Sequence, residues 1–102
     1  MKKVVIIGGG ASGLFASIYI KKYCPENEVI VVERLERIGK KILATGNGRC
    51  NFSNTHVNTK KYNNSGFVSH TLKELDYKKL ISELEELGLM TTTDNEGRTY
   101  PY

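Results

Sequence analysis

The stretch KVVIIGGGASGLFAS, residues 3–17, decides the fold of this 102-residue chain. Its first five residues, Lys3 to Ile7, form a short β-branched run that is typical of a strand buried on both faces. Three glycines follow, and from Ala11 to about Tyr23 apolar residues recur at the spacing of one helix face. Pro25 then ends the helical pattern. The sequence therefore predicts a strand, a tight turn and a helix.

A second strand is predicted for EVIVVE, residues 28–33, which has the same buried-type composition. Strand, helix and strand within 33 residues make a βαβ unit, in which the strands are parallel and the connection is right-handed. The predicted fold class is therefore α/β, with a Rossmann-like βαβ unit at the N-terminus.

The rest of the chain is predicted as one long loop followed by two helices and a hairpin. Residues 34–66 are polar and rich in glycine and asparagine, so we expect mostly loop, with a short helix around Lys40 to Leu43. After residue 66 a short helix is expected, and then a second one that is capped by Asp76 and ended by a left-handed Gly88. The charged residues of this second helix, Glu83 among them, are expected to face solvent. LMTTT and RTYPY flank residues 94–97 as in a β-hairpin.

Composition limits the classes of partner. Fifteen Lys and Arg against eleven Asp and Glu give a charge of +4, which predicts no nucleic-acid partner without a concentrated patch and suits a small anionic ligand. The apolar N-terminus is interrupted by glycines and is too short to span a membrane, so neither a signal peptide nor a membrane partner is predicted. Cys24 and Cys50 show no metal or disulfide spacing, which favours reduced thiols and a cytoplasmic protein.

The glycines of the first turn carry the chemical argument. Gly8, Gly10 and Gly13 fit GxGxxG between a predicted strand and a predicted helix, and Glu33 follows Gly13 by 20 positions. In this pattern the first glycine permits a tight turn, the second lets a pyrophosphate approach, and the third lets the helix lie close to the sheet. The acidic residue accepts hydrogen bonds from ribose hydroxyls. The sequence therefore predicts a dinucleotide site, and the pattern alone does not separate FAD from NAD.

Three blocks, KKVVIIGGGASGLFAS, VVERLERIGKKILATGNGRCNFSN and EGRTYPY, resemble the N-terminal part of the BaiN/YhiN-like (HI0933-like) flavoproteins over nearly the whole chain. Members of that family are considerably longer FAD-dependent oxidoreductases of the two-dinucleotide-binding-domain type, some linked to reduction of unsaturated steroid or bile-acid intermediates. The resemblance implies an N-terminal fragment that binds FAD, with NAD(P)H as a candidate electron donor and an unidentified small-molecule substrate. We expect such a fragment to be inactive alone and to self-associate through exposed strand edges.

The resemblance also assigns residues to the cofactor. It implies a partial FAD-binding domain over 1–102, divided into a βαβ unit (1–33), a second flavin-binding segment (34–66) and helices with a hairpin (67–102). The diphosphate and adenosine end would be held by Gly8, Gly10, Ala11, Ser12, Gly13, Glu33 and Arg34. The second segment, which runs towards the isoalloxazine, would use Lys40, Lys41, Thr45, Gly46, Gly48, Arg49, Cys50 and Asn51.

The residues of the second segment agree with that assignment by their chemistry. Glycines allow close backbone approach, and the planar fork of Arg49 can meet a phosphate or a reduced-flavin anion. Asn47 stands where many relatives have glycine, which puts a left-handed backbone there in question. Cys50 lacks a resolving partner and an evident base, so packing is favoured over catalysis. His56 and His70 are predicted as surface or helix residues.

Three functions stay open at this point. The leading one is the FAD-binding portion of a flavin-dependent oxidoreductase, in which the flavin itself transfers a hydride or electrons. The first alternative is the NAD-binding module of a dehydrogenase or reductase. The second is a non-catalytic fragment that binds no nucleotide. No catalytic residue is assigned in any of them, and no metal site is predicted.

Overall fold

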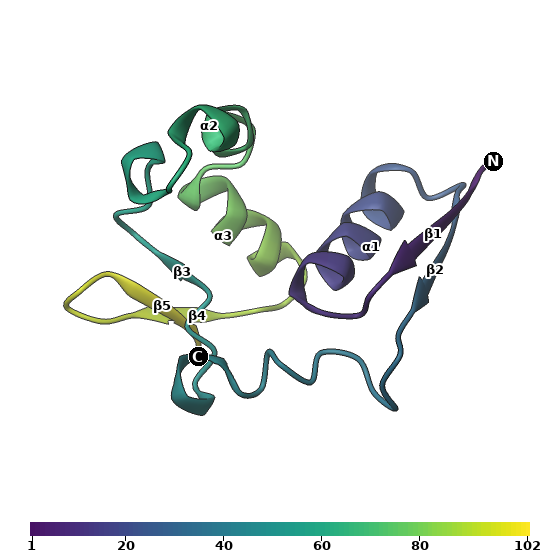
Figure 1. Ribbon diagram of the computed structural model, residues 1–102, viewed down its shortest axis with the longest axis horizontal. Coiled ribbons are helices and arrows are strands. Elements are labelled where there is room, and N and C mark those ends of the chain that lie inside the picture. Colours follow the sequence, from purple (N-terminus) through teal and green to yellow (C-terminus); the bar gives the residue numbers. More distant parts are fainter. The chain divides into compact units, whose positions relative to one another are not determined.

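Strand β1 (Lys3–Ile7), helix α1 (Ala11–Tyr23) and strand β2 (Glu28–Val32) form the predicted βαβ unit (Figure 1). The two strands are parallel, with register from Lys3↔Glu28 to Ile7↔Val32. The computed structural model describes residues 1–102, which divide into two units, Met1–Ala44 and Thr45–Tyr102. The Rossmann-like α/β prediction is thus confirmed, and each unit is described below by itself.

The prediction that β1 and β2 are buried on both faces is wrong. The side chains of Val5, Ile7 and Val32 are 51%, 82% and 48% exposed. Val4 and Ile6 alternate with them along β1 and are half-buried, because α1 covers only one face of the two-stranded sheet. β-branched composition reports strand conformation, whereas burial depends on how many layers cover the sheet.

The short helix predicted around Lys40 to Leu43 is also absent. Residues 34–44 form successive turns, in which Ile42 N–H donates to the Gly39 carbonyl (3.1 Å) and Ala44 N–H to the Lys41 carbonyl (3.1 Å). Gly39, directly before Lys40, has a left-handed φ of +69°, so no helix continues into this segment from residue 38. The segment returns to the first turn, since Gly39 N–H donates to the Gly9 carbonyl at 2.7 Å.

The second unit contains three strands, two α-helices and two short 3₁₀ segments. Its elements are η1 (Thr45–Gly48), β3 (Ser53–Asn54), η2 (Thr59–Lys61), α2 (Ser65–Glu74), α3 (Tyr77–Glu86), β4 (Thr91–Thr93) and β5 (Arg98–Pro101). The sheet order is β3-β5-β4 with antiparallel pairs, so the predicted hairpin is confirmed. Strand β3 lies inside the predicted loop 34–66. It has two residues and pairs across more than 40 positions, so no local pattern could reveal it.

Helix α3 has the predicted ends. The side chain of Asp76 accepts a hydrogen bond from Lys79 N–H (2.9 Å), and Gly88 has a φ of +90°. Glu83, however, is only 8% exposed, so the expectation that it faces solvent is wrong. It lies three residues after Leu80 and four before Leu87, which places it beside the apolar stripe of the helix.

The interior of the second unit is centred on β5. Thr99 is fully buried and Tyr100 is 6% exposed. The Tyr77 hydroxyl lies 2.9 Å from Thr99 Oγ1, which connects the start of α3 to the middle strand of the sheet. Across the whole chain, no helix combines the length and the apolar character needed to cross a bilayer.

Candidate functional site

The turn between β1 and α1 is built around Gly8 and Gly13. Gly8 has a φ of +105°, and its N–H donates to the Val32 carbonyl at 2.7 Å. A Cβ on Gly13 would collide with the Gly8 carbonyl oxygen and would stand 3.3 Å from Ile6 Cγ2. The first glycine therefore makes the left-handed turn and the third allows close contact between helix and sheet.

Gly10 differs from both because the protein itself does not require it. Its φ of −84° is open to any residue, and a Cβ there would meet nothing within 4 Å. Gly10 caps α1 without a side-chain hydrogen bond, and the first turn carries no acidic residue. The amides of Ala11, Ser12 and Gly13 have no carbonyl partner within the helix and lie at the positive end of the helix dipole, although Gly13 itself is buried. This free space and these donors fit a diphosphate.

Glu33 is fixed directly after β2. Its Oε1 accepts a hydrogen bond from Gly9 N–H (2.9 Å) and its Oε2 from Leu35 N–H (2.7 Å). These amides, Leu35 first and then Gly9, hold the pKa of Glu33 below its ordinary value, with Arg34 adding a smaller electrostatic contribution and desolvation opposing them. Each carboxylate oxygen keeps a lone pair for a ribose hydroxyl. The carboxylate therefore holds the glycine turn through Gly9 while both of its oxygens keep acceptor capacity.

Sequence reasoning missed the role of Gly9, the position that GxGxxG leaves free. Gly9 is buried, and a Cβ there would stand 2.7 Å from Ile38 Cγ2 and 3.4 Å from Glu33 Cβ. The three consecutive glycines were the available signal, because the dinucleotide pattern needs only the first and third of them. Ile38 packs against this backbone and occupies the space that a side chain at Gly9 would need.

We expect Glu33→Gln to flatten the acid dependence of stability in the first unit. The lowered pKa means that the ionised carboxylate stabilises the fold at neutral pH, and this stabilisation is lost as the pH falls through the lowered folded-state pKa. Thermal melts from about pH 6 to about pH 3, followed by circular dichroism, measure this. Over this pH range, the melting temperature of the wild type should fall further than that of the variant. Equal decreases in melting temperature for the wild type and the variant would mean that the Glu33 carboxylate does not stabilise the glycine turn.

The cationic residues after Glu33 are exposed. Arg34, Lys40 and Lys41 all lie on the surface of the first unit. Lys40 lines an open cleft of about 590 Å³ together with Leu35, Glu36 and Arg37. This cleft lies in the segment that returns to Gly9, so the structure brings it near the glycine turn within the same unit.

The remaining predicted residues form one continuous turn in the second unit. Gly46, Asn47, Gly48 and Cys50 all have positive φ values, of 58°, 57°, 81° and 58°. Asn47 thus adopts a left-handed backbone, which the sequence had left in question because many relatives have glycine there. Cys50 also has a left-handed backbone, and its residue type gave no sign of this. The turn is closed by Cys50 N–H, which donates to the Thr45 carbonyl at 2.9 Å.

Asn51 closes this turn and attaches it to the sheet. A Cβ on Gly46 would collide with the Asn51 amide nitrogen of the backbone, so the turn folds tightly on itself. With its side-chain amide oriented to suit its neighbours, Asn51 donates to the carbonyls of Ser53 (3.0 Å) and Thr99 (3.3 Å). Asn51 therefore anchors the turn to the sheet. Cys50 is a half-buried free thiol.

The guanidinium of Arg49 stacks on Tyr100. Its Cζ lies 4.0 Å from the centroid of the Tyr100 ring, a cation–π geometry. Tyr100 is buried and Arg49 is exposed, and no carboxylate pairs with the guanidinium. The ring thus fixes the plane of the guanidinium while its N–H donors stay available to an anion. Sequence reasoning missed Tyr100, since 51 positions separate the two residues.

The comparisons with known proteins agree with this geometry. The model of the HI0933-like protein Rossmann domain matches residues 2–102. The chain belongs to this family. It is 40% identical over 103 aligned residues to the 3-dehydro-bile acid delta(4,6)-reductase of Clostridium scindens, which covers 99% of the chain and 25% of that relative.

Two further relatives carry a different name. The chain is 37% identical over 87 residues to the ribosomal RNA dihydrouridine synthase of Haemophilus influenzae, covering 83% of the chain and 21% of the relative. It is 38% identical over 58 residues to the protein of the same name from Escherichia coli, covering 57% and 14%. The chain thus spans a quarter or less of the length of these curated relatives. Family membership supports a dinucleotide-binding portion of an oxidoreductase.

Proposed function

We propose that this chain is the FAD-binding N-terminal part of a flavin-dependent oxidoreductase. The observation that carries the proposal is the open position above Gly10, which faces the uncapped N-terminus of α1. A glycine that the apoprotein does not need, next to unpaired amides, is what close approach of a pyrophosphate requires. Membership of the HI0933-like Rossmann family supports the same conclusion.

In this proposal the first unit holds the adenosine diphosphate end of the cofactor. The amides of Ala11, Ser12 and Gly13 donate to the diphosphate, and the free lone pairs of Glu33 accept from the ribose hydroxyls. The carboxylate would repel a 2′-phosphate, which favours an unphosphorylated ribose. The exposed side chain of Arg34 lies next to this carboxylate and suits the adenosine end.

The second flavin-binding segment is proposed to comprise Lys40, Lys41 and the turn from Thr45 to Asn51. Gly48 has open space around its Cβ position, so a planar ligand can approach the backbone there. Arg49, with its plane set by Tyr100, is placed to meet a phosphate or the anion of a reduced flavin. A bound flavin supplies hydride or electron transfer, and the residues described here supply binding and electrostatics.

The names of the relatives suggest a reaction class. One relative is named a Δ4,6-reductase of a bile acid and two are named for making dihydrouridine in ribosomal RNA. Both names describe addition of hydrogen across a carbon–carbon double bond, so we propose that the parent reaction adds a hydride and a proton to such a bond. The bile acid relative suggests a small-molecule substrate, and the ribosomal RNA relatives make RNA the second candidate.

Titration of the 102-residue chain with FAD, ADP and NADH tests the proposal. FAD and ADP should both bind, because both present a diphosphate to α1. FAD should bind at least about 10-fold more tightly than ADP, since its flavin part adds contacts with the second segment that ADP lacks. Calorimetry and the flavin absorbance band give the affinities. If the chain binds NADH but not FAD, the NAD-binding alternative is supported. If it binds none of the three nucleotides, the non-catalytic fragment that binds no nucleotide is supported.

A further inference from the structure

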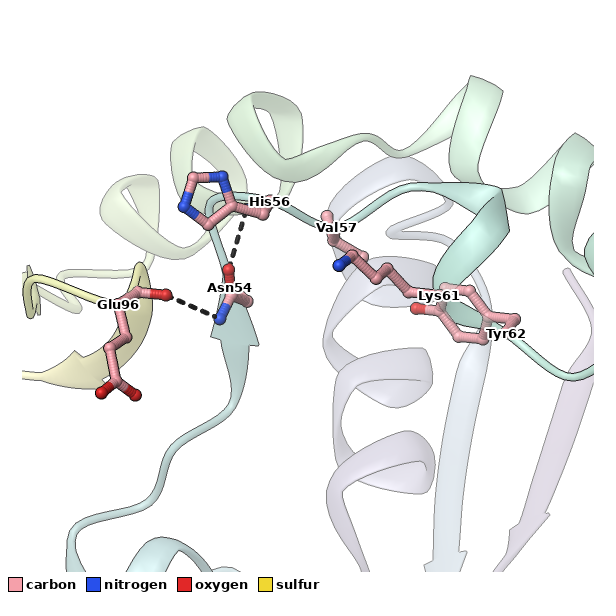
Figure 2. A pocket seen from close by; sticks show the side chains of 6 residues that line it. All are labelled: Asn54, His56, Val57, Lys61, Tyr62 and Glu96. Carbon is pink, nitrogen blue, oxygen red and sulfur yellow. Dashed lines mark hydrogen bonds between the residues drawn. The ribbon is translucent and has the colours of Figure 1, made fainter.

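An open cleft in the second unit is lined by none of the residues assigned individually to the dinucleotide, although five of its six lining residues belong to the segment 34–66. It has a volume of about 430 Å³ and is lined by Asn54, His56, Val57, Lys61, Tyr62 and Glu96 (Figure 2). That volume is within the range of small-molecule sites. All six residues belong to one unit, so the cleft is defined by that unit alone.

The one charge of the cleft lining without a partner is that of Lys61, which has no carboxylate beside it. Glu96 is the one acidic lining residue, and its Oε2 lies 3.3 Å from Nη2 of Arg98, whose Nε also pairs with Asp94 Oδ2 at 2.6 Å. These three side chains form an ion-pair network of their own. The Lys61 ammonium is therefore the group left to recognise a ligand, and it favours an anionic group.

The backbone that carries this ammonium is held in place by two asparagines. Asn54 Oδ1 accepts from His56 N–H (2.8 Å), and Asn54 Nδ2 donates to the Glu96 carbonyl (3.3 Å). Figure 2 shows both hydrogen bonds between the residues that line the cleft. Asn58 accepts from Lys60 N–H (2.9 Å) and donates to the His56 carbonyl (3.1 Å), which fixes the start of η2. The ammonium therefore stands on a preorganised loop.

The other side of the cleft is apolar. Val57 and the ring of Tyr62 line it beside Lys61, and Tyr62 is 43% exposed. From this combination we propose that the cleft binds a small organic carboxylate that carries a ring or a short apolar chain. The carboxylate pairs with Lys61, and the apolar part lies against Tyr62 and Val57. This site does not depend on dinucleotide binding, so either proposal can fail alone.

Titration of the 102-residue chain with benzoate tests this inference, and the chain offers a matched control. Lys60 and Lys61 are neighbours in η2 with the same charge, and only Lys61 lines the cleft. Lys61→Met should raise the dissociation constant for benzoate about 5- to 10-fold, and Lys60→Met less than about 2-fold. Benzamide, which has the ring without the charge, should bind the wild type about 5-fold more weakly than benzoate. Chemical shifts of residues 54–62 locate the binding.

Several outcomes would overturn the inference. Equal effects of the two lysine variants, or equal affinity for inorganic phosphate and benzoate, would indicate charge attraction without a site. Displacement of benzoate by FAD would assign the cleft to the flavin. If Lys61→Met fails to fold by circular dichroism, Tyr62→Leu replaces it and should weaken benzoate binding while phosphate binding stays unchanged. Unchanged benzoate affinity in that variant would contradict the apolar contact.

Discussion

Gly13→Ala is expected to lower the free energy of unfolding of the first unit by about 3 kcal/mol or more. The new methyl group would collide with the Gly8 carbonyl oxygen, whose residue is held by its own hydrogen bond to Val32. Helix propensity alone predicts the opposite sign, since alanine is about 1 kcal/mol better than glycine inside a helix. Urea denaturation followed by circular dichroism measures the change, and hydrogen exchange in α1 assigns it to the first unit.

Gly66→Ala is the matched control for that variant. Gly66 also lies near the start of a helix, α2, and its Cβ would meet only Asn64 Oδ1, at an ordinary 3.8 Å. This substitution should leave stability unchanged or raise it by up to about 1 kcal/mol. If Gly13→Ala and Gly66→Ala had equal free energies of unfolding, α1 would not lie as close to the Gly8 carbonyl as the structure shows.

Gly10→Ala is expected to lower FAD affinity about 100-fold while leaving the melting temperature nearly unchanged. The free protein has room for the methyl group, and the backbone at Gly10 has a φ that alanine adopts without strain. A bound diphosphate would need the same space, so the cost arises only in the complex. About 100-fold corresponds to about 2.7 kcal/mol of binding free energy. Flavin absorbance titration and a thermal melt of the same sample measure both quantities.

The two glycine variants together separate a structural role from a ligand role. Gly13→Ala should lose stability and binding together, whereas Gly10→Ala should lose binding alone. ADP should show the same loss as FAD with Gly10→Ala, because the affected contact is with the diphosphate. Wild-type affinity in Gly10→Ala would mean that no ligand approaches this turn, and the proposed cofactor site would be wrong.

Elements with local signals were predictable from the sequence. The β-branched run of β1, the glycine turn and the helical spacing of α1 lie within 23 residues, and their bounds agree with the structure. The ends of α3 were equally clear, because Asp76 and Gly88 act on backbone groups within four residues of themselves. The helix predicted at Lys40 to Leu43 is absent because the backbone there closes separate turns, from Gly39 to Ile42 and from Lys41 to Ala44, in place of a helical hydrogen-bond series.

The candidate site was predictable only in part. GxGxxG and Glu33 mark the turn, but the bonds of Glu33 to Gly9 and Leu35 are visible only in the structure. The stacking of Arg49 on Tyr100 joins residues from opposite ends of the second unit. A pattern of residue types within a short window carries no information about such a pairing.

By itself, therefore, the sequence determined that ATGNGRCN, residues 44–51, would be a glycine-rich turn behind a strand, a turn and a helix. Tertiary structure alone decided that Arg49 lies over Tyr100, that β3 joins the hairpin and that one sheet face of the first unit stays exposed. Turns and caps are decided by neighbours along the chain, through backbone angles and hydrogen bonds a few residues long. Burial and side-chain pairing depend on which distant segments the folded chain brings together.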